Sequence, residues 1–290
     1  MKIVILGADG QLGRELSEKL VKSFLVHPLS RSDCDITNFS MFESVIKYIQ
    51  PNIIINTAAY TNVDGAEDNF DEANEINNKS LLNMSKVANS IDAILVHFST
   101  DYVFNVSNEI PIVEETQKNP INKYGFTKHL GEEVLIKNCK KYFIFRISWV
   151  YGQFGNNFPK KIISLAKEKE TLKIINDQVG IPTSTSFIAE TINIILSNKK
   201  YIDHYGIYNL SPSGSTTWFS FAIKLIDEIK INTDISLKIK EIIPVNSDEF
   251  ITKAKRPKYS CLDNTKLKKM FKINTYNWEN YLMNDLKSLL

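Results

Sequence analysis

The amino-acid sequence predicts an α/β fold with a doubly wound parallel sheet and a smaller, interleaved C-terminal lobe. Three observations lead to this class. Short β-branched runs alternate with longer helical patterns through the first half, a glycine-rich turn directly follows the first run, and helices separated by polar loops dominate the second half. Apolar strands that alternate with helices are typical of parallel sheets covered on both faces.

The first half contains the predicted sheet. Strands are expected at residues 3–6, 25–29, 53–56, 94–99 and 142–147, and helices at 15–25, 41–50, 74–90 and 121–137. Pro51 ends the second helix, because proline cannot continue a helix. This order predicts a Rossmann-type domain over residues 1–150.

The second half has a different pattern of helices and loops. Helices are expected at residues 159–169, 186–197 and 218–229, with loops rich in Gly, Pro, Ser and Thr between them. No linker marks a boundary. We therefore expect residues 151–290 to form mainly a substrate-binding lobe that closes over the sheet and returns at least one strand to it.

Composition and charge exclude several classes of protein. The formal net charge of +2 is too small to indicate a nucleic-acid or membrane partner. Cys34, Cys139 and Cys261 lie far apart, without the spacing of a metal site or a disulfide framework. No apolar stretch reaches the roughly 18 residues that span a bilayer. The sequence predicts a cytoplasmic protein.

The glycine-rich turn predicts a dinucleotide site. Gly7, Gly10 and Gly13 lie between the first strand and the first helix, where backbone N–H groups can approach a pyrophosphate. Gln11 and Leu12 open that helix, so their amides are expected to contribute. The GxxGxxG spacing favours a short-chain dehydrogenase over enzymes with a separate Rossmann domain.

The tip of the second strand bears on the choice of cofactor. An acid that binds the adenosine ribose is expected about 20 residues after the glycines, but Ser30 and Arg31 occupy this position. Arg31 is suited to a 2′-phosphate, which favours NADPH, with NADH also accepted. A surface arginine without a ligand is the alternative. Asp35 and Ile36 are better placed for the adenine.

The end of the third strand carries small residues. Ala58 and Ala59, followed by Tyr60, would let the backbone approach a dinucleotide closely. Simple packing of small side chains is the alternative interpretation.

A catalytic group is predicted from a helix and a strand end. Tyr124 and Lys128 are four residues apart, so they share one helix face, where the ammonium would lower the tyrosine pKa. Thr100 ends the fourth strand, at the sheet edge where ligands of open α/β sheets bind, with Asp101 and Tyr102 after it. Its hydroxyl can polarise a carbonyl, although such residues also form ordinary turns.

Six ordered motifs resemble the dTDP-4-dehydrorhamnose reductases, a family of extended short-chain dehydrogenases/reductases. They are GADGQLG at 7–13, NTAAYTNVD at 56–64, STDYVF at 99–104, NKYGFTK at 122–128, RISWVY at 146–151 and NDQVGIPT at 176–183. The resemblance implies hydride transfer from a nicotinamide cofactor to C4 of a keto sugar. It implies that Tyr124 donates the proton, Lys128 binds the nicotinamide ribose and Thr100 holds the carbonyl oxygen.

The resemblance also implies residues that contact the nucleotide sugar. Besides Thr100, Asp101 and Tyr102, the candidates are Trp149 against the sugar, Asn157 and Gln178 on loops, and Arg256 on the diphosphate. Each has a structural alternative: core packing for Trp149, loop caps for Asn157 and Gln178, and a surface charge for Arg256.

A magnesium ion found at a dimer interface in some members is not expected here. Glu15 matches one ligand, but Ser184, Thr185 and Ser186 stand where another acid would be needed. We therefore predict no tightly held magnesium, and either a monomer or a homodimer.

Two other functions remain open. A sugar-nucleotide dehydratase or epimerase uses the same scaffold, but dehydratases carry Asp-Glu after the threonine, whereas Asp101 is followed here by Tyr102. A non-catalytic regulatory subunit, similar to the methionine adenosyltransferase beta subunit, would bind cofactor without turnover. The intact set of Thr100, Tyr124 and Lys128 favours catalysis.

Overall fold

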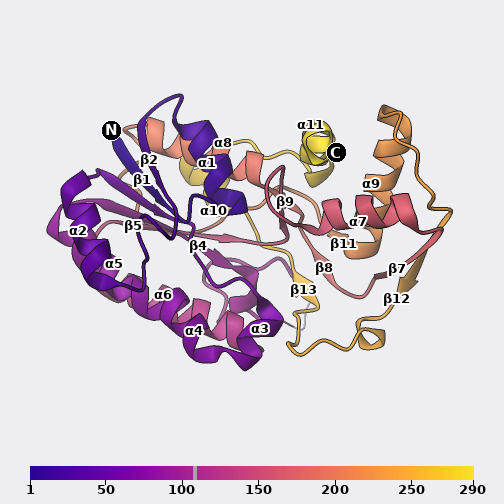
Figure 1. Cartoon of the computed structure of the whole chain (residues 1–290), viewed down its shortest axis with the longest axis horizontal. Helices are drawn as coiled ribbons and strands as arrows, with labels where there is room; N and C mark the ends of the chain where they lie inside the picture. Colours follow the sequence, from indigo (N-terminus) through magenta and orange to yellow (C-terminus); the bar gives the residue numbers. More distant parts are fainter. Residues whose placement is uncertain (107–109) are drawn as a thin grey trace.

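A six-stranded parallel sheet lies at the centre of the larger part of the molecule (Figure 1). The computed structural model describes residues 1–106 and 110–290. The strand order is β10-β5-β4-β3-β1-β2. The strands are β1 (Lys2–Leu6), β2 (Leu25–Leu29), β3 (Ile53–Asn56), β4 (Ile94–Thr100), β5 (Tyr142–Ile147) and β10 (Gly206–Asn209). The predicted parallel α/β fold is confirmed.

Burial explains the order of the strands. Every residue of β3 and β4 is buried, which is why these runs are continuously apolar at the centre of the sheet. β2 lies at an edge of the sheet, and Leu25 is exposed there. Pro28, which has no N–H to donate, is tolerated because no other described strand pairs with the outer side of β2. At the other edge, β10 pairs with β5 and brings the second half of the chain into the sheet.

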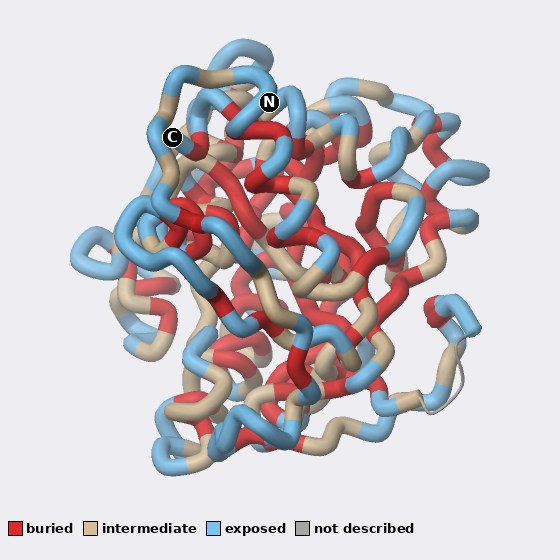
Figure 2. The backbone as a smooth tube through the Cα atoms, turned by 90° about the vertical axis from the view of Figure 1, so that its right-hand side faces the viewer, coloured by how far each residue is buried: buried red, intermediate tan, exposed pale blue. Residues whose placement is uncertain are grey.

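Helices cover both faces of the sheet. On β1, Ile3 and Ile5 point into a core closed by α1, α8 and α10, whereas Val4 and Leu6 point into a core closed by α2, α5 and α6. The first group is α1 (Gln11–Leu20), α8 (Thr185–Ser197) and α10 (Thr265–Phe271); the second is α2 (Phe39–Ile49), α5 (Ser80–Ser90) and α6 (Lys123–Asn138). In Figure 2 the buried segments lie towards the middle of the molecule and the exposed segments around its edge.

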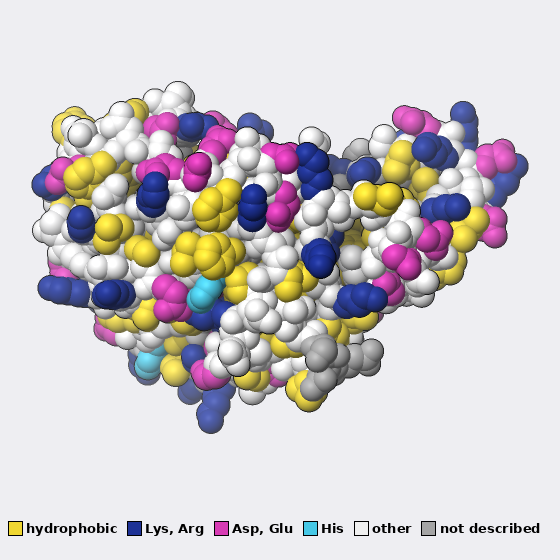
Figure 3. Space-filling view, turned by 90° about the horizontal axis from the view of Figure 1, so that it is seen from below, with side chains coloured by type: hydrophobic (Ala, Val, Ile, Leu, Met, Phe, Trp, Pro, Cys, Tyr) yellow, Lys and Arg dark blue, Asp and Glu magenta, His cyan; other side chains and the backbone are white. Residues whose placement is uncertain are grey.

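A smaller lobe projects beyond the sheet, visible to the right in Figure 3. Its own core packs residues from α7, α9 and α11 over short strands. These elements are α7 (Phe158–Glu168), α9 (Trp218–Asn232), α11 (Trp278–Leu289), β7 (Thr171–Ile175) paired with β12 (Glu241–Val245), and β8 (Val179–Gly180) between β11 (Thr216–Thr217) and β13 (Tyr259–Ser260). β6 (Val150–Tyr151) and β9 (Thr183–Ser184) form a short pair where the chain leaves the sheet.

Two predicted helices are corrected. The helix expected at 15–25 is α1, which begins at Gln11 because Gly10 serves as its N-cap, and residue 25 already belongs to β2. The helix expected at 74–90 is three segments, α4 (Phe70–Asn74), a π-helical turn (Glu75–Lys79) and α5, preceded by α3 (Val63–Asp68). In the part of the chain that the structure describes, no helix is both long and apolar enough to cross a bilayer.

Candidate active site

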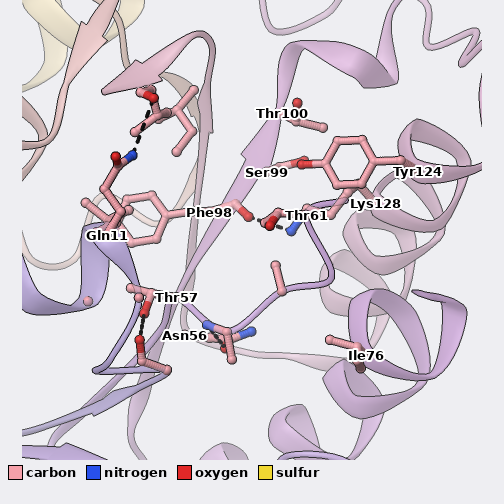
Figure 4. Close-up of a pocket in the computed structure, with 18 of the residues that line it drawn as sticks. Gln11, Asn56, Thr57, Thr61, Ile76, Phe98, Ser99, Thr100, Tyr124 and Lys128 are labelled. Carbon is pink, nitrogen blue, oxygen red and sulfur yellow. Dashed lines mark hydrogen bonds between the residues drawn. The ribbon is translucent and has the colours of Figure 1, made fainter. Parts of the chain in front are cut away.

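A cavity of about 660 Å³ opens at the carboxyl ends of the central strands (Figure 4). Most residues predicted to bind cofactor or substrate line it. These are Gly7, Gly10, Gln11, Leu12, Arg31, Asp35, Ile36, Ala58, Ala59, Thr100, Asp101, Tyr102, Tyr124, Lys128 and Trp149. Residues separated by more than 100 positions in sequence therefore meet around one space.

The glycine turn forms one end of the cavity. Gly7 has a φ of 72°, and a Cβ there would lie 2.7 Å from the Ala58 nitrogen. Gly10 is the N-cap of α1 and supplies no side chain to the amides of the first turn. A Cβ on Gly13 would lie 2.3 Å from the Gly7 oxygen, so the helix can start this close to β1 only without one. The open amides fit a pyrophosphate.

Arg31 lies beside the cavity with its side chain 73% exposed. Its Nε is 3.4 Å from Asp35 Oδ2, and the Asp35 carboxylate also accepts from the Thr37 amide at 2.9 Å. The guanidinium therefore makes one long contact with Asp35, through Nε, and its other N–H groups can donate to an anion. An exposed pair of this kind contributes little to stability.

Tyr124 lies on α6, against the end of β4. Asn122 caps this helix by accepting from the Gly125 amide at 2.7 Å. A Cβ on Gly125 would lie 2.2 Å from the Tyr102 oxygen, which shows how closely α6 packs on the 3₁₀ turn Asp101–Val103. Burial raises the pKa of Tyr124 to about 12, although the hydrogen bond between Tyr124 and Thr100 lowers it. Burial likewise raises the pKa of Asp101 to about 6.

Lys128 is buried one turn further along α6. Its Nζ donates to the Phe98 carbonyl at 2.7 Å and lies 3.1 Å from His97 Nε2. Burial lowers its pKa to about 8. The lowering of the Tyr124 pKa that was predicted from Lys128 is outweighed here by burial, and the Lys128 amine donates to the Phe98 carbonyl of β4 (Figure 4).

Trp149 lines the cavity from the smaller lobe's side. Its backbone has a φ of 46°, a conformation that residues other than glycine rarely adopt. Its ring stacks on Trp218 at 3.6 Å between centroids, and a Cβ on Gly180 would lie 2.4 Å from Trp149 Cε2. The strained backbone and the two flanking surfaces fix the indole at the cavity wall.

Four predicted site residues do not line the cavity in the described part of the chain. Asn157 caps α7 and donates to Gln11 Oε1 at 2.8 Å, so it acts next to the cofactor loop. Gln178 accepts from Trp218 Nε1 at 3.2 Å. Both ends of the Arg256 guanidinium bond Asp64, at 2.6 and 3.3 Å. The Tyr60 amide donates to Asn77 Oδ1 at 2.9 Å.

Several lining residues were not predicted. Asn56, Thr57, Ser99 and Ser148 all lie at or just after strand ends and line the cavity. Their position at the carboxyl edge of the sheet was the available signal. His97 does not line the cavity but contacts Lys128 from β4, and a single histidine inside an apolar strand resembles a core residue in the sequence.

Glu15 has protein partners at the position matched to a magnesium ligand. Its Oε2 accepts from Thr185 Oγ1 at 3.0 Å and from Gln153 Nε2 at 3.4 Å. Among residues 1–106 and 110–290, no group of three or more His, Cys, Asp or Glu side chains is arranged to hold a metal ion.

The chain is similar over nearly its whole length to known dTDP-4-dehydrorhamnose reductases. A family model described as RmlD substrate binding domain matches residues 1–290. The chain is 37% identical to the reductases of Salmonella typhimurium and Escherichia coli, over 96% of this chain and 95% of each relative. A Bacillus anthracis dTDP-4-dehydrorhamnose reductase solved with NADP is 36% identical, with a TM-score of 0.92 over 99% of this chain and 98% of that one. The chain therefore belongs to the RmlD family of dTDP-4-dehydrorhamnose reductases.

Proposed function

We propose that this protein uses NADPH to reduce the C4 keto group of dTDP-4-dehydro-L-rhamnose, giving dTDP-L-rhamnose for rhamnose-containing surface polysaccharide. The observation that carries the proposal is the meeting of Thr100, Tyr124 and Lys128 on the wall of the cavity that begins at the glycine turn. The names of the relatives and the NADP held by one of them support it.

The residues at the α1 end fit a dinucleotide. The uncapped amides after Gly10 would hold the diphosphate, and Arg31 would pair with a 2′-phosphate, which favours NADPH while leaving NADH usable. Ile36 and Asp35 line the cavity beside Arg31, where the adenine would lie. When bound, the cofactor supplies the hydride that reduces the carbonyl carbon.

Tyr124 supplies the proton in this proposal. Its phenol is protonated at neutral pH because burial disfavours the phenolate. It would donate to the sugar C4 oxygen as that oxygen gains negative charge, and the Thr100 hydroxyl beside it would donate a second hydrogen bond. Lys128 would offer an N–H to the nicotinamide ribose.

The nucleotide sugar would occupy the part of the cavity between Asp101, Tyr102 and Trp149. We propose that residues 151–290 mainly form this substrate side. Arg256 would pair with the diphosphate by exchanging Asp64 for it. Asn157 and Gln178 remain predicted substrate residues. Asn157 bonds the lining residue Gln11, and Gln178 is linked through Trp218 to the lining residue Trp149.

The test is NADPH oxidation, followed by absorbance, with dTDP-4-dehydro-L-rhamnose generated in situ by the upstream enzymes. Oxidation that requires the sugar and disappears in Tyr124→Phe supports the reductase. Turnover only with another keto sugar would favour a different nucleotide-sugar reductase or epimerase. Cofactor binding without any turnover, together with stable co-purification with a larger enzyme, would favour the regulatory subunit.

The cellular setting is part of the same proposal. A nucleotide-sugar reductase that depends on NADPH works where both are made, so we propose a cytoplasmic enzyme. We propose a monomer or a homodimer without a bridging magnesium, because Glu15 is bonded to the Thr185 hydroxyl and the Gln153 amide.

A further inference from the structure

A stacked pair of tryptophans joins the smaller lobe to the wall of the cavity. Trp149 lines the cavity, whereas Trp218, the first residue of α9, is absent from its lining among the described residues. The ring centroids are 3.6 Å apart, and the ring planes differ by 9°. Two indoles in this contact shield one another's faces from water. The place of Trp218 therefore limits where the Trp149 ring can lie.

The backbone of Trp149 does not determine the place of its ring alone. Its φ of 46° is a strained conformation that persists only when neighbouring contacts hold it. The Trp149 carbonyl accepts from the Thr183 amide at 3.2 Å, which holds the main chain. A Cβ on Gly180 would lie 2.4 Å from Trp149 Cε2, so that residue bounds one edge of the ring. Trp218 bounds a face of the ring.

Trp218 is fixed in turn by the smaller lobe. Thr217 caps α9 by accepting from the Ser220 amide at 3.1 Å, which sets the backbone at the start of the helix. The Trp218 ring packs on Phe158, with 4.6 Å between ring centroids. Its Nε1 donates to Gln178 Oε1 at 3.2 Å, and Gln178 is only 6% exposed. A hydrogen bond shielded from water in this way fixes the rotation of the indole.

We propose that Trp218 is a positioning residue, which holds the Trp149 indole ready for the nucleotide sugar without contacting the sugar itself. Gln178 acts through the same indole. This role rests on the proposed function, in which the sugar lies against Trp149. A wall that is fixed before the ligand arrives saves the cost of ordering it on binding. The hydride and the proton come from the cofactor and Tyr124, so loss of Trp218 should weaken sugar binding more than it slows the chemistry.

Steady-state kinetics test this role. Trp218→Leu should raise KM for dTDP-4-dehydro-L-rhamnose by about two- to tenfold, the range expected for a lost aromatic pair, and change kcat by less than about twofold. The dissociation constant of NADPH should stay the same. Trp218→Phe keeps a ring against Trp149 and should recover most of the loss. Trp278→Phe, which alters a tryptophan buried in the core of the same lobe, is the control. A normal KM in Trp218→Leu, or an equal loss in Trp218→Phe, would overturn the proposal.

A double variant separates positioning from direct contact. If Trp218 acts only through Trp149, Trp149→Leu combined with Trp218→Leu should raise KM no further than Trp149→Leu does alone. Additive increases would mean that Trp218 contacts the substrate, and would refute the role. If Trp218→Leu does not fold, Gln178→Leu keeps both rings and frees only the Trp218 N–H. It should raise KM when Trp149 is present and not after Trp149→Leu, and an equal rise in both backgrounds would refute the role.

NMR of the full-length protein labelled with ¹⁵N-tryptophan gives a readout that needs no turnover. The chain has three tryptophans, so each indole N–H signal is assigned by its loss in one variant. The Trp149 signal should move in Trp218→Leu, because the ring stacked on it is gone, and should stay in place in Trp278→Phe. A Trp149 signal unchanged by Trp218→Leu would overturn the proposal. Absence of turnover with that response intact would count only against the reductase.

Discussion

Tyr124 illustrates how one side chain depends on its surroundings. Sequence spacing alone placed a cation beside it, but in the fold the half-buried Tyr124 lies beside Thr100 and Asp101 on the cavity wall, and the amine of Lys128 is bonded to β4. Burial therefore sets its protonation more than the neighbouring lysine does. The residue is built to keep a proton until a developing oxyanion takes it.

We expect Tyr124→Phe to lower kcat by about 10²–10⁴-fold, because it removes only the proton donor. The dissociation constant of NADPH should stay within about twofold, since the ring and its packing remain. Steady-state kinetics and fluorescence titration of the cofactor measure the two effects. Tyr48→Phe, which alters a tyrosine 91% exposed, is the matched control. Wild-type turnover in Tyr124→Phe would disprove the assignment.

Arg31→Ala should weaken NADPH by roughly tenfold and NADH by less than about twofold. A charge-assisted bond to a 2′-phosphate is worth about 1.5–3 kcal/mol, and NADH lacks that phosphate. Binding titrations of both cofactors at low and high salt measure the difference. Lys47→Ala removes an exposed cation from α2 and should change neither affinity. Equal losses for both cofactors would take Arg31 out of the site.

Asp101 should make stability depend on pH in a defined window. Its folded pKa, about 6, exceeds its unfolded value of about 3.9, so the native state binds the proton more tightly. This group stabilises the fold below about pH 4, and the contribution of about 2–3 kcal/mol is lost as pH rises through 6. Urea unfolding at several pH values should therefore show a flatter profile for Asp101→Asn than for wild type. Asp234→Asn, at an exposed position, should follow wild type. A parallel profile for Asp101→Asn would show that the carboxyl does not change protonation on unfolding.

At the scale of elements, Gly131 lets α6 pack closely against the π-helical turn Glu75–Lys79. A Cβ on Gly131 would lie 2.2 Å from the Asn77 oxygen in the π-helical turn, and Asn77 Nδ2 donates to Thr127 Oγ1 at 3.1 Å. The π-helical turn therefore gives α6, and with it Tyr124, a rigid support.

Gly131→Ala should destabilise the protein by about 1–3 kcal/mol and also lower kcat, because α6 must move away from the π-helical turn. Urea unfolding and steady-state kinetics measure the two effects. Lys137→Ala, on the exposed end of the same helix, should change the unfolding free energy by less than about 0.5 kcal/mol. An unchanged melting profile in Gly131→Ala would mean that the contact relaxes without cost.

Elements with a strong local signal could be predicted from the sequence. The strands β2, β3 and β5 lie where their apolar runs indicated, and the carboxyl edge correctly grouped Thr100 with the glycine turn. The π-helical turn could not be predicted, since it depends on the contact with α6. The partners of Gln178 and Arg256 come from segments about 40 and 190 positions away, which no local pattern encodes.

At the scale of the whole molecule, residues 253–256 tie the smaller lobe back to α3. Asp64 accepts from the Ala254 amide at 3.0 Å and from both ends of Arg256, while Lys253 pairs with Asp68 on the surface. Asn122 Nδ2 also donates to the Lys255 carbonyl at 2.7 Å, next to the start of α6. This segment links the position of the smaller lobe to that of the catalytic helix.

Arg256→Met should lower the unfolding free energy by about 1–2 kcal/mol, because it leaves a half-exposed carboxylate without its two-bond partner. It should also raise KM for the nucleotide sugar more than it lowers kcat. Lys253→Met removes a neighbouring cation from an exposed pair and should cost less than about 1 kcal/mol. Equal effects of the two substitutions would show that Asp64 does not need the guanidinium.

The place of β10 in the sheet has a consequence for the synthesis of the chain. β5 packs Phe143 and Phe145 against Tyr208 of β10. β10 can pair with β5 only after residues 206–209 have been translated. Until then, a nascent chain that already carries the glycine turn and Tyr124 exposes an unpaired strand edge next to a row of aromatic rings. Such edges recruit other strands. Ribosome-bound chains should therefore need chaperone protection until about three-quarters of the protein has left the exit tunnel.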